Sequence, residues 1–133
     1  MKFLIAYLVT AAVFLVIDYI WLGAIMKDYF QTELSHLMAD EVNLSIAALF
    51  YLFYAAGIVV LCINPALESG GWTRAIMNGA ILGFLAYGTY DITNMATLRE
   101  WPTMLSVIDV TWGTGLTALS SVAGYFAVHL YLN

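Results

Sequence analysis

The chain has 133 residues, of which 63% are hydrophobic and 10% are charged, and its formal net charge is −5. A soluble domain carries about 25% charged residues, so this composition excludes a soluble globular protein and indicates an integral membrane protein. The acidic balance argues against nucleic acid and anionic lipid headgroups as partners, because neither surface attracts a negatively charged protein. The length fits a single membrane domain over residues 1–133.

Four apolar stretches are long enough to cross a bilayer. At a rise of 1.5 Å per residue, about 20 helical residues cross a hydrocarbon core roughly 30 Å thick. We expect spans at approximately 3–26, 44–63, 75–98 and 103–132. The sequence therefore predicts an all-α, polytopic integral membrane protein that folds as a compact four-transmembrane-helix bundle.

The connections between these stretches carry their own signals. Pro65 is expected to stop the second helix, and Pro102 is expected to open the fourth, where a missing N–H costs nothing. Trp101 is expected to anchor the chain at the membrane interface. In the segment 27–43, apolar residues recur with helical spacing at Phe30, Leu34, Leu37 and Met38. This spacing predicts a short interfacial amphipathic helix between the first and second spans.

Four spans place both termini on the same side of the membrane, and we expect that side to be cytoplasmic. Lys2 and Arg74 would face one compartment while Lys27 and Arg99 face the other, so the positive-inside rule gives no decision. The acidic first loop favours cytoplasmic termini. The balanced count is also compatible with insertion in both orientations and with an antiparallel homodimer.

Three aspartates interrupt the apolar stretches: Asp18 in the first, Asp91 in the third and Asp109 in the fourth. A charged side chain near the middle of a spanning helix costs roughly 2.5 to 3.5 kcal/mol, so such residues are expected to face a partner, a ligand or water. Counted from the helix ends on one side of the membrane, the three carboxylates lie about 9 to 12 Å below that surface. Tyr51 and Tyr54 of the second span reach a similar depth. We therefore expect one intramembrane site centred on the three acids.

The third and fourth spans each have a face of small and polar residues. The two faces are Gly79, Gly83, Tyr87, Asp91 and Asn94, and Asp109, Gly113, Thr117, Ser120 and Gly124. These two stripes are expected to meet, because small residues allow membrane helices to approach closely. Trp21 and Trp112 each follow an aspartate by three residues, and an indole N–H can donate to a buried carboxylate. The expected ligand-binding residues are Asp18, Asp91, Asp109, Asn94, Trp21, Trp112, Tyr51, Tyr54 and Tyr87.

Three short segments combine an acid with aromatic and small residues. They are Asp18-Tyr-Ile-Trp-Leu-Gly23, Tyr90-Asp-Ile-Thr-Asn94 with Ala96-Thr-Leu98, and Asp109-Val-Thr-Trp-Gly113. Together they resemble the bacterial membrane proteins grouped as domain of unknown function 2177, over essentially the whole chain. The resemblance implies a small, multi-pass, four-helix protein of the bacterial inner membrane with these acidic and aromatic positions. It implies no activity.

Three classes of function are compatible with an intramembrane carboxylate and aromatic site. In the first, the site binds a proton, a cation or a cationic or polar small molecule, and the protein is transport-related. No lysine or arginine lies at the depth of the acids to neutralise them. No cofactor is evident. If a hard cation is bound, its expected ligands are Asp18, Asp91 and Asp109, whose oxygens suit sodium, magnesium, calcium or manganese.

The other two classes remain open at this stage. A membrane enzyme acting on a lipid or isoprenoid substrate could use one protonated aspartate as an acid and an ionised neighbour as a base. Alternatively, the acids could be protonated and hydrogen-bonded to the tyrosines and tryptophans in a structural or partner subunit of a membrane complex. The sequence does not decide whether the protein is an enzyme. The expected partners are the lipid bilayer and a small-molecule, ion or lipid ligand, and not nucleic acid.

Overall fold

The computed structural model describes residues 1–37 and 43–132 of the chain. Over these residues the regular secondary structure is entirely helical, which confirms the predicted all-α class. Two of the helical segments, η1 and η2, are single π-helical turns that continue a preceding α-helix. In chain order the elements are α1 (Lys2–Ile20), η1 (Trp21–Ile25), α2 (Lys27–Leu34), α3 (Leu44–Ile58), η2 (Val59–Ile63), α4 (Asn64–Glu68), α5 (Gly71–Thr97) and α6 (Thr103–Leu132).

Three helical segments are long and apolar enough to cross a membrane. They are Lys2–Ile25, Leu44–Glu68 and Thr103–Leu132. The sequence predicted four such spans. α5 has the required length, with 27 residues, but polar side chains such as Asn78, Asp91 and Asn94 lower its hydropathy below that of the other three. The structure therefore supports a membrane protein with three strongly apolar helices, and a compact bundle of four spans stays a prediction.

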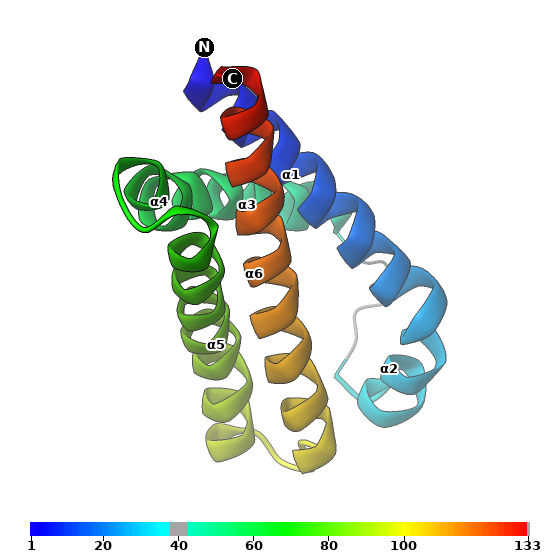
Figure 1. Ribbon diagram of the computed structural model, residues 1–133. Helices are drawn as coiled ribbons and strands as arrows, with labels where there is room; N and C mark the ends of the chain where they lie inside the picture. Colours follow the sequence, from blue (N-terminus) through cyan, green and yellow to red (C-terminus); the bar gives the residue numbers. More distant parts are fainter. Residues whose placement is uncertain (38–42, 133) are drawn as a thin grey trace.

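The helices are arranged around the α5–α6 pair. Figure 1 shows α5 and α6 side by side and antiparallel, with α1 close to α6 near the termini and diverging from it toward α2. The segment from α3 to α4 runs across the other helices rather than along them. Both termini lie at the same end of the molecule.

Small residues determine how closely α5 and α6 approach. A Cβ atom added at Gly79 would lie 2.8 Å from the Cα of Ala118, and one added at Gly83 would lie 2.9 Å from the Cα of Thr114. Both distances are shorter than the 3.5 to 4.0 Å of an ordinary carbon contact. The backbones can therefore touch only because these positions lack side chains. In this region the two predicted stripes do meet.

The stripe on α6 does not face α5 along its whole length. Gly113 lies under the ring of Tyr87 from α5, but Gly124 faces Thr10 of α1 and Ile63 of η2. A helix surrounded by several neighbours presents different faces to them at different heights. The last part of the α6 stripe thus packs α1 against α6 near the termini.

The expectation that Pro65 ends the second helix was wrong. Helical structure continues through η2 and α4, with Pro65 in the first turn of α4. Proline cannot donate to the carbonyl four residues earlier, which belongs to Leu61. The side-chain amide of Asn78 donates to that carbonyl over 3.2 Å instead. Arg74 then caps the end of α4 by donating to the carbonyl of Pro65 over 3.3 Å and to the hydroxyl of Ser69 over 2.9 Å.

The predicted amphipathic helix is present in part. α2 ends at Leu34, and Leu37 lies in a turn, while Met38, Asp40 and Glu41 fall outside the described residues. α6 begins directly after Pro102, as predicted.

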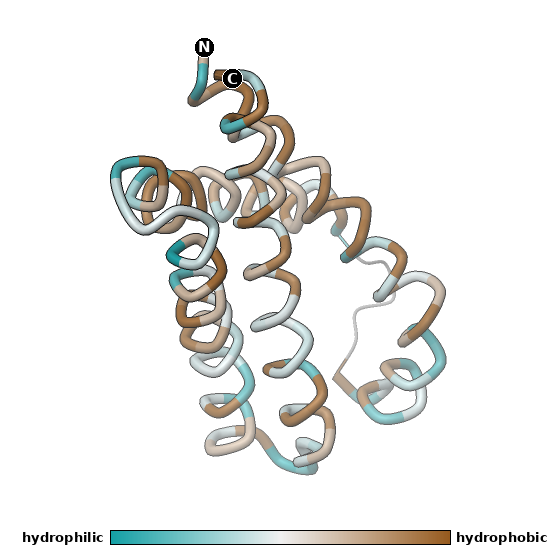
Figure 2. The backbone as a smooth tube through the Cα atoms, in the orientation of Figure 1, coloured by the Kyte–Doolittle hydropathy of each residue, from teal (hydrophilic) through white to brown (hydrophobic). Residues whose placement is uncertain are grey.

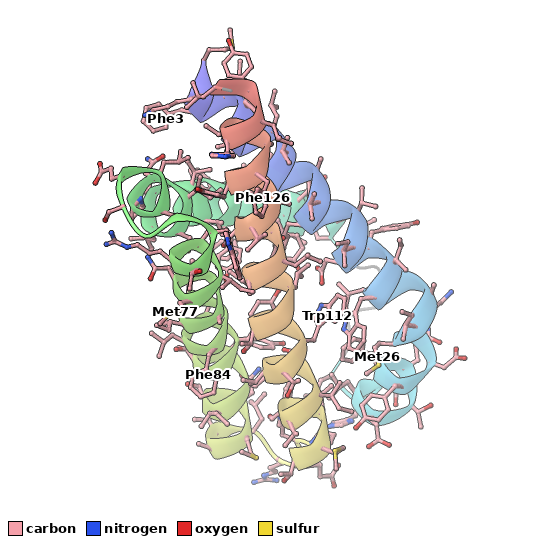
Figure 3. The ribbon with its side chains drawn as sticks, in the orientation of Figure 1. Phe3, Met26, Met77, Phe84, Trp112 and Phe126 are labelled. Carbon is pink, nitrogen blue, oxygen red and sulfur yellow. The ribbon has the colours of Figure 1, made fainter. Side chains whose placement is uncertain are left out.

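The surface has the polarity expected of a protein in a bilayer. Figure 2 shows hydrophobic residues along the lengths of α1 and α6, and hydrophilic ones at α2 and at the turns that flank α5. Met77 and Phe84 on α5 are exposed and point away from α6 (Figure 3). Large exposed apolar side chains are normal where lipid is the solvent. The outward face of α5 is therefore compatible with lipid, although the helix as a whole is more polar.

Candidate functional site

A cavity of about 780 Å³ lies between α1, α3, α5 and α6, in the space where α1 diverges. Phe30 and Leu34 of α2 contribute to its wall, so α2 folds over the cavity. The described lining contains Asp18, Asp91 and Asp109 and no lysine, arginine or histidine. The structure thus brings the three predicted acids to one cavity, from three different helices.

Asp91 is the most deeply buried of the three acids. Its side chain is 1% exposed, and among the described residues neither carboxyl oxygen has a hydrogen-bond partner. The adjacent group is the carboxyl of Asp109 on α6, close enough for the two to share a hydrogen bond when one of them carries a proton. Two ionised carboxylates are both acceptors, so they cannot satisfy one another. A proton or a cation between them would turn this repulsive contact into an attractive one.

A short hydrogen-bond chain fixes the backbone at this acid pair. The indole of Trp101 donates to the hydroxyl of Ser106 over 2.9 Å. The Ser106 hydroxyl in turn donates to the backbone carbonyl of Asp91 over 3.3 Å. These bonds tie the α5–α6 connection and α6 to the turn of α5 that carries Asp91. The backbone that carries Asp91 is therefore held by Ser106 of α6, and Ser106 is itself held by Trp101.

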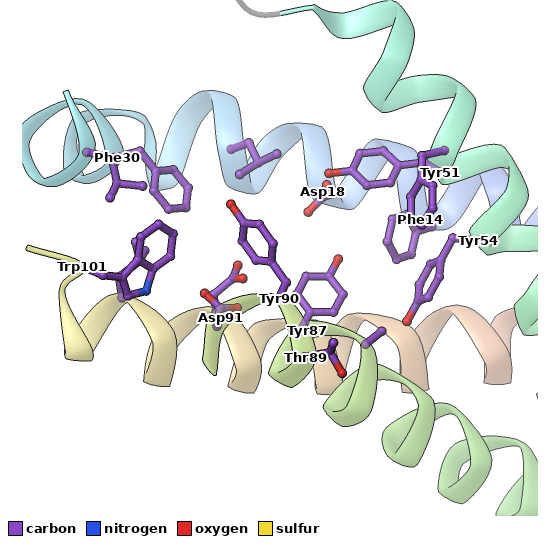
Figure 4. A pocket seen from close by; sticks show the side chains of 16 residues that line it. Phe14, Asp18, Phe30, Tyr51, Tyr54, Tyr87, Thr89, Tyr90, Asp91 and Trp101 are labelled. Carbon is purple, nitrogen blue, oxygen red and sulfur yellow. The ribbon is translucent and has the colours of Figure 1, made fainter. Parts of the chain in front are cut away.

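Asp18 has a different environment. It is 4% exposed, and it accepts a hydrogen bond from the indole N–H of Trp112 over 3.2 Å. Figure 4 shows the hydroxyl of Tyr51 directed toward Asp18 from the cavity side, and the two groups interact. Asp18 is thus held by donors from α6 and α3. Its Oδ1 is therefore already engaged by an indole N–H.

Trp21 and Trp112 lie on the far side of Asp18 from the cavity. Their rings stack with centroids 4.0 Å apart and an angle of 6° between their planes. They line a separate, largely apolar groove of about 440 Å³ between α1 and α6. Neither tryptophan is among the residues that line the cavity, so their part in ligand binding stays a prediction. Their stacked rings pack η1 against α6, and the indole of Trp112 also donates to Asp18.

Three predicted tyrosines line the cavity. Tyr54 shares a hydrogen bond of 2.9 Å with Thr117 of α6, and Tyr87 lies over Gly113. The rings of Tyr51 and Tyr54 both meet the ring of Phe14 edge to face, with centroid distances of 5.4 and 5.3 Å. Burial of their rings explains why these aromatic residues gather here. Their hydroxyls leave the Asp91 carboxyl without a donor.

Asn94 is not among the residues that line the cavity. It lies nearly one helical turn beyond Asp91, toward the end of α5, and interacts with Tyr90 instead. The predicted three-aspartate metal site is likewise unsupported, because the described part of the chain contains no group of three acidic, histidine or cysteine side chains arranged to hold a metal ion.

Several lining residues were not predicted from the sequence. Phe14 precedes Asp18 by four residues and so shares its helix face, a signal that would have identified it. Trp101 was assigned to the membrane interface, yet it lines the cavity and meets Tyr90 edge to face at 6.1 Å. Phe30 is brought in by the folding of α2 over the cavity. The positions of Trp101 and Phe30 depend on how the connections between the helices turn, which the sequence pattern does not show.

The comparisons with known proteins identify a family, and its description names no activity. No curated protein and no solved structure matches the chain. A family model described as a predicted membrane protein, DUF2177, matches residues 3–126. This match covers most of the length of the chain, and it includes the helices that carry all three cavity acids. The chain therefore belongs to the DUF2177 family of predicted membrane proteins.

Proposed function

We propose that this protein is a transport-related membrane protein in which the Asp91–Asp109 pair binds a proton or a cation inside the cavity. The observation that carries the proposal is the Asp91 carboxyl, which is almost completely buried, has no hydrogen-bond donor among the described residues and is in contact with a second carboxyl. Intramembrane ionisable residues usually mark pathways for ions, protons or substrates.

If both carboxyls of the acid pair were ionised, they would repel strongly in a medium of low dielectric constant, and the described lining of the cavity contains no basic side chain to offset them. A purely structural role would require hydrogen bonds that satisfy the acids. Asp18 has such bonds, but the hydroxyl of Tyr54 bonds to Thr117 and does not reach Asp91. The acid pair is therefore the place where an external proton or cation is needed.

We also propose that α5 crosses the membrane as a fourth span. At 1.5 Å per residue its 27 residues extend about 40 Å, which is enough to cross the hydrocarbon core. α5 packs along α6, one of the three strongly apolar spans, through Gly79 and Gly83. Its polar residues can then face the cavity while Met77 and Phe84 face lipid. We propose four spans in the bacterial inner membrane, with both termini on the cytoplasmic side because the first loop is acidic.

Infrared spectroscopy of the purified protein in lipid nanodiscs tests whether the acid pair holds a proton. A protonated carboxyl has a C=O stretch that an ionised carboxylate lacks, so we expect this band in the wild type near neutral pH. Asp91→Asn and Asp109→Asn should each remove the band. Asp28→Asn provides a matched control, because Asp28 is an exposed acid on α2 outside the cavity.

A cation bound in place of the proton would give a different result in the same samples. The band would then be absent, and titration with sodium, magnesium or calcium would change the ionised carboxylate bands of the wild type but not those of Asp91→Asn. If neither the protonated band nor a cation-dependent change is observed, the acid pair binds neither ligand and the proposal is wrong.

A further inference from the structure

We infer that the ligand of this cavity is a lipophilic organic cation, which takes its place beside the Asp91–Asp109 pair; this inference rests on the proposed function. The acid pair alone is compatible with a proton or any cation, whereas this inference names one class of ligand. Three features of the cavity support it: the placement of aromatic rings on both sides of Asp91, the size of the cavity and the polarity of the exposed residues that line it.

The aromatic rings that line the cavity form two groups, and rings flank Asp91 on both sides. In one group, Phe14, Tyr51 and Tyr54 meet edge to face. In the other, Tyr90 meets Trp101 edge to face. Figure 4 shows Asp91 between Trp101 and Tyr90, with Phe14, Tyr51 and Tyr54 beyond Tyr90. Ring faces attract organic cations and provide apolar contact for their substituents, so a cation held by the carboxyls would have aromatic contacts at both ends.

The arrangement is less suitable for a metal ion. A hard cation such as magnesium or calcium takes six or more oxygen ligands. Here the Oδ1 of Asp18 accepts from Trp112 and its carboxyl interacts with Tyr51, so the acid pair is the main source of carboxylate ligands. An organic cation carries its charge with little hydration, and it needs charge neutralisation and apolar contact rather than a complete oxygen shell.

The cavity volume agrees with a molecule of this kind. Pockets for drug-sized ligands enclose about 300 to 1,000 Å³, and this cavity encloses about 780 Å³. A single proton or metal ion would leave nearly all of that space to water beside apolar rings. A molecule with several apolar groups around one positive charge would fill it.

Three residues that line the cavity are also exposed at the surface of the helices. Leu22 of η1, Phe50 of α3 and Tyr90 of α5 all line the cavity, yet they are 39%, 64% and 58% exposed. These residues are apolar or aromatic, so the route past them suits a ligand that is already dissolved in the bilayer. A lipophilic cation has that property, because it partitions into membranes and still carries a charge for the acid pair.

Equilibrium dialysis with two probes of the same shape and opposite charge tests the inference. Tetraphenylphosphonium is a lipophilic cation, and tetraphenylborate is an anion of nearly identical size. We expect the wild type in detergent to bind the phosphonium saturably, with the borate binding no better than it does to empty micelles. Equal saturable binding of both probes would overturn the inference, since the site would then select apolar shape and not positive charge.

Variants separate the contributions of charge and aromatic contact. Asp91→Asn should weaken phosphonium binding by roughly 30-fold, the size expected when a buried charge loses its partner. Asp91→Glu should retain most of the binding, which shows that a loss in Asp91→Asn is not caused by unfolding. Trp101→Leu should weaken binding by about 5-fold to 30-fold through loss of a cation–aromatic contact. Asp28→Asn should bind as the wild type does.

Failure of this inference can be distinguished from failure of the proposed function. If the phosphonium does not bind while the infrared band of a protonated carboxyl is present and depends on Asp91, the acid pair still holds a proton and only the organic cation is excluded. If Asp91→Asn and Trp101→Leu both bind the phosphonium as tightly as the wild type, the probe occupies another site and the inference is wrong.

Discussion

The close contact between α5 and α6 makes a quantitative prediction about two glycines on the same helix. A Cβ atom at Gly83 would lie 2.9 Å from both the Cα of Thr114 and the Cβ of Thr117, whereas a Cβ at Gly88 would have nothing within 4 Å. Ordinary carbon contacts are 3.5 to 4.0 Å, so Gly83→Ala should force the helices apart by roughly 0.6 to 1 Å. Gly88→Ala should be accommodated without movement.

The two variants allow the steric cost to be isolated. Replacing glycine by alanine in a helix gains about 0.8 to 1.0 kcal/mol of helix propensity in each variant, so this gain cancels in the comparison. Overpacking a tight contact costs about 1 to 3 kcal/mol. We therefore expect the free energy of unfolding of Gly83→Ala to be about 1 to 3 kcal/mol lower than that of Gly88→Ala.

Unfolding in mixed micelles of dodecyl maltoside and dodecyl sulfate, followed by tryptophan fluorescence, would measure this difference. The site provides a second measurement, because Gly83 lies about two turns before Asp91 on α5 and separation of the helices would move the acid pair. Phosphonium binding should weaken in Gly83→Ala and remain unchanged in Gly88→Ala. Equal stability of the two variants would refute the close approach of α5 to α6.

Two hydrogen bonds between helices give further predictions. Trp112→Phe removes the donor to Asp18 while keeping an aromatic ring against Trp21. It should lower the free energy of unfolding by roughly 0.6 to 1.7 kcal/mol, the average and the maximum for hydrogen bonds between membrane helices. An unchanged free energy of unfolding would show that the bond contributes nothing. Asn78→Leu leaves the carbonyl of Leu61 without its donor and should cost about 1 kcal/mol in the same micelle assay, whereas a more stable variant would contradict the capping role of Asn78.

The candidate site could be predicted in part, and its residues show why. Asp18, Asp91 and Asp109 were identified because a charged residue stands out in an apolar helix and helix length gives its depth. The partner of each acid could not be found in this way. Depth does not fix rotation about the helix axis, so it could not show that Trp112 lines a separate groove and donates to Asp18. That Trp101 lines the cavity could not be predicted either, because its position depends on how the chain turns between α5 and α6.

Composition and periodicity alone determined that this protein is helical and belongs in a membrane, because apolar length and the cost of burying unpaired backbone leave few other solutions. They also determined which three residues need a partner. Tertiary structure decided which of those partners exist: it paired Asp91 with Asp109, gave Asp18 the indole of Trp112, and carried the second helix past Pro65 with the help of Asn78. These outcomes depend on side chains that meet across helices, and contacts of that kind are set by packing, which no single segment of sequence contains.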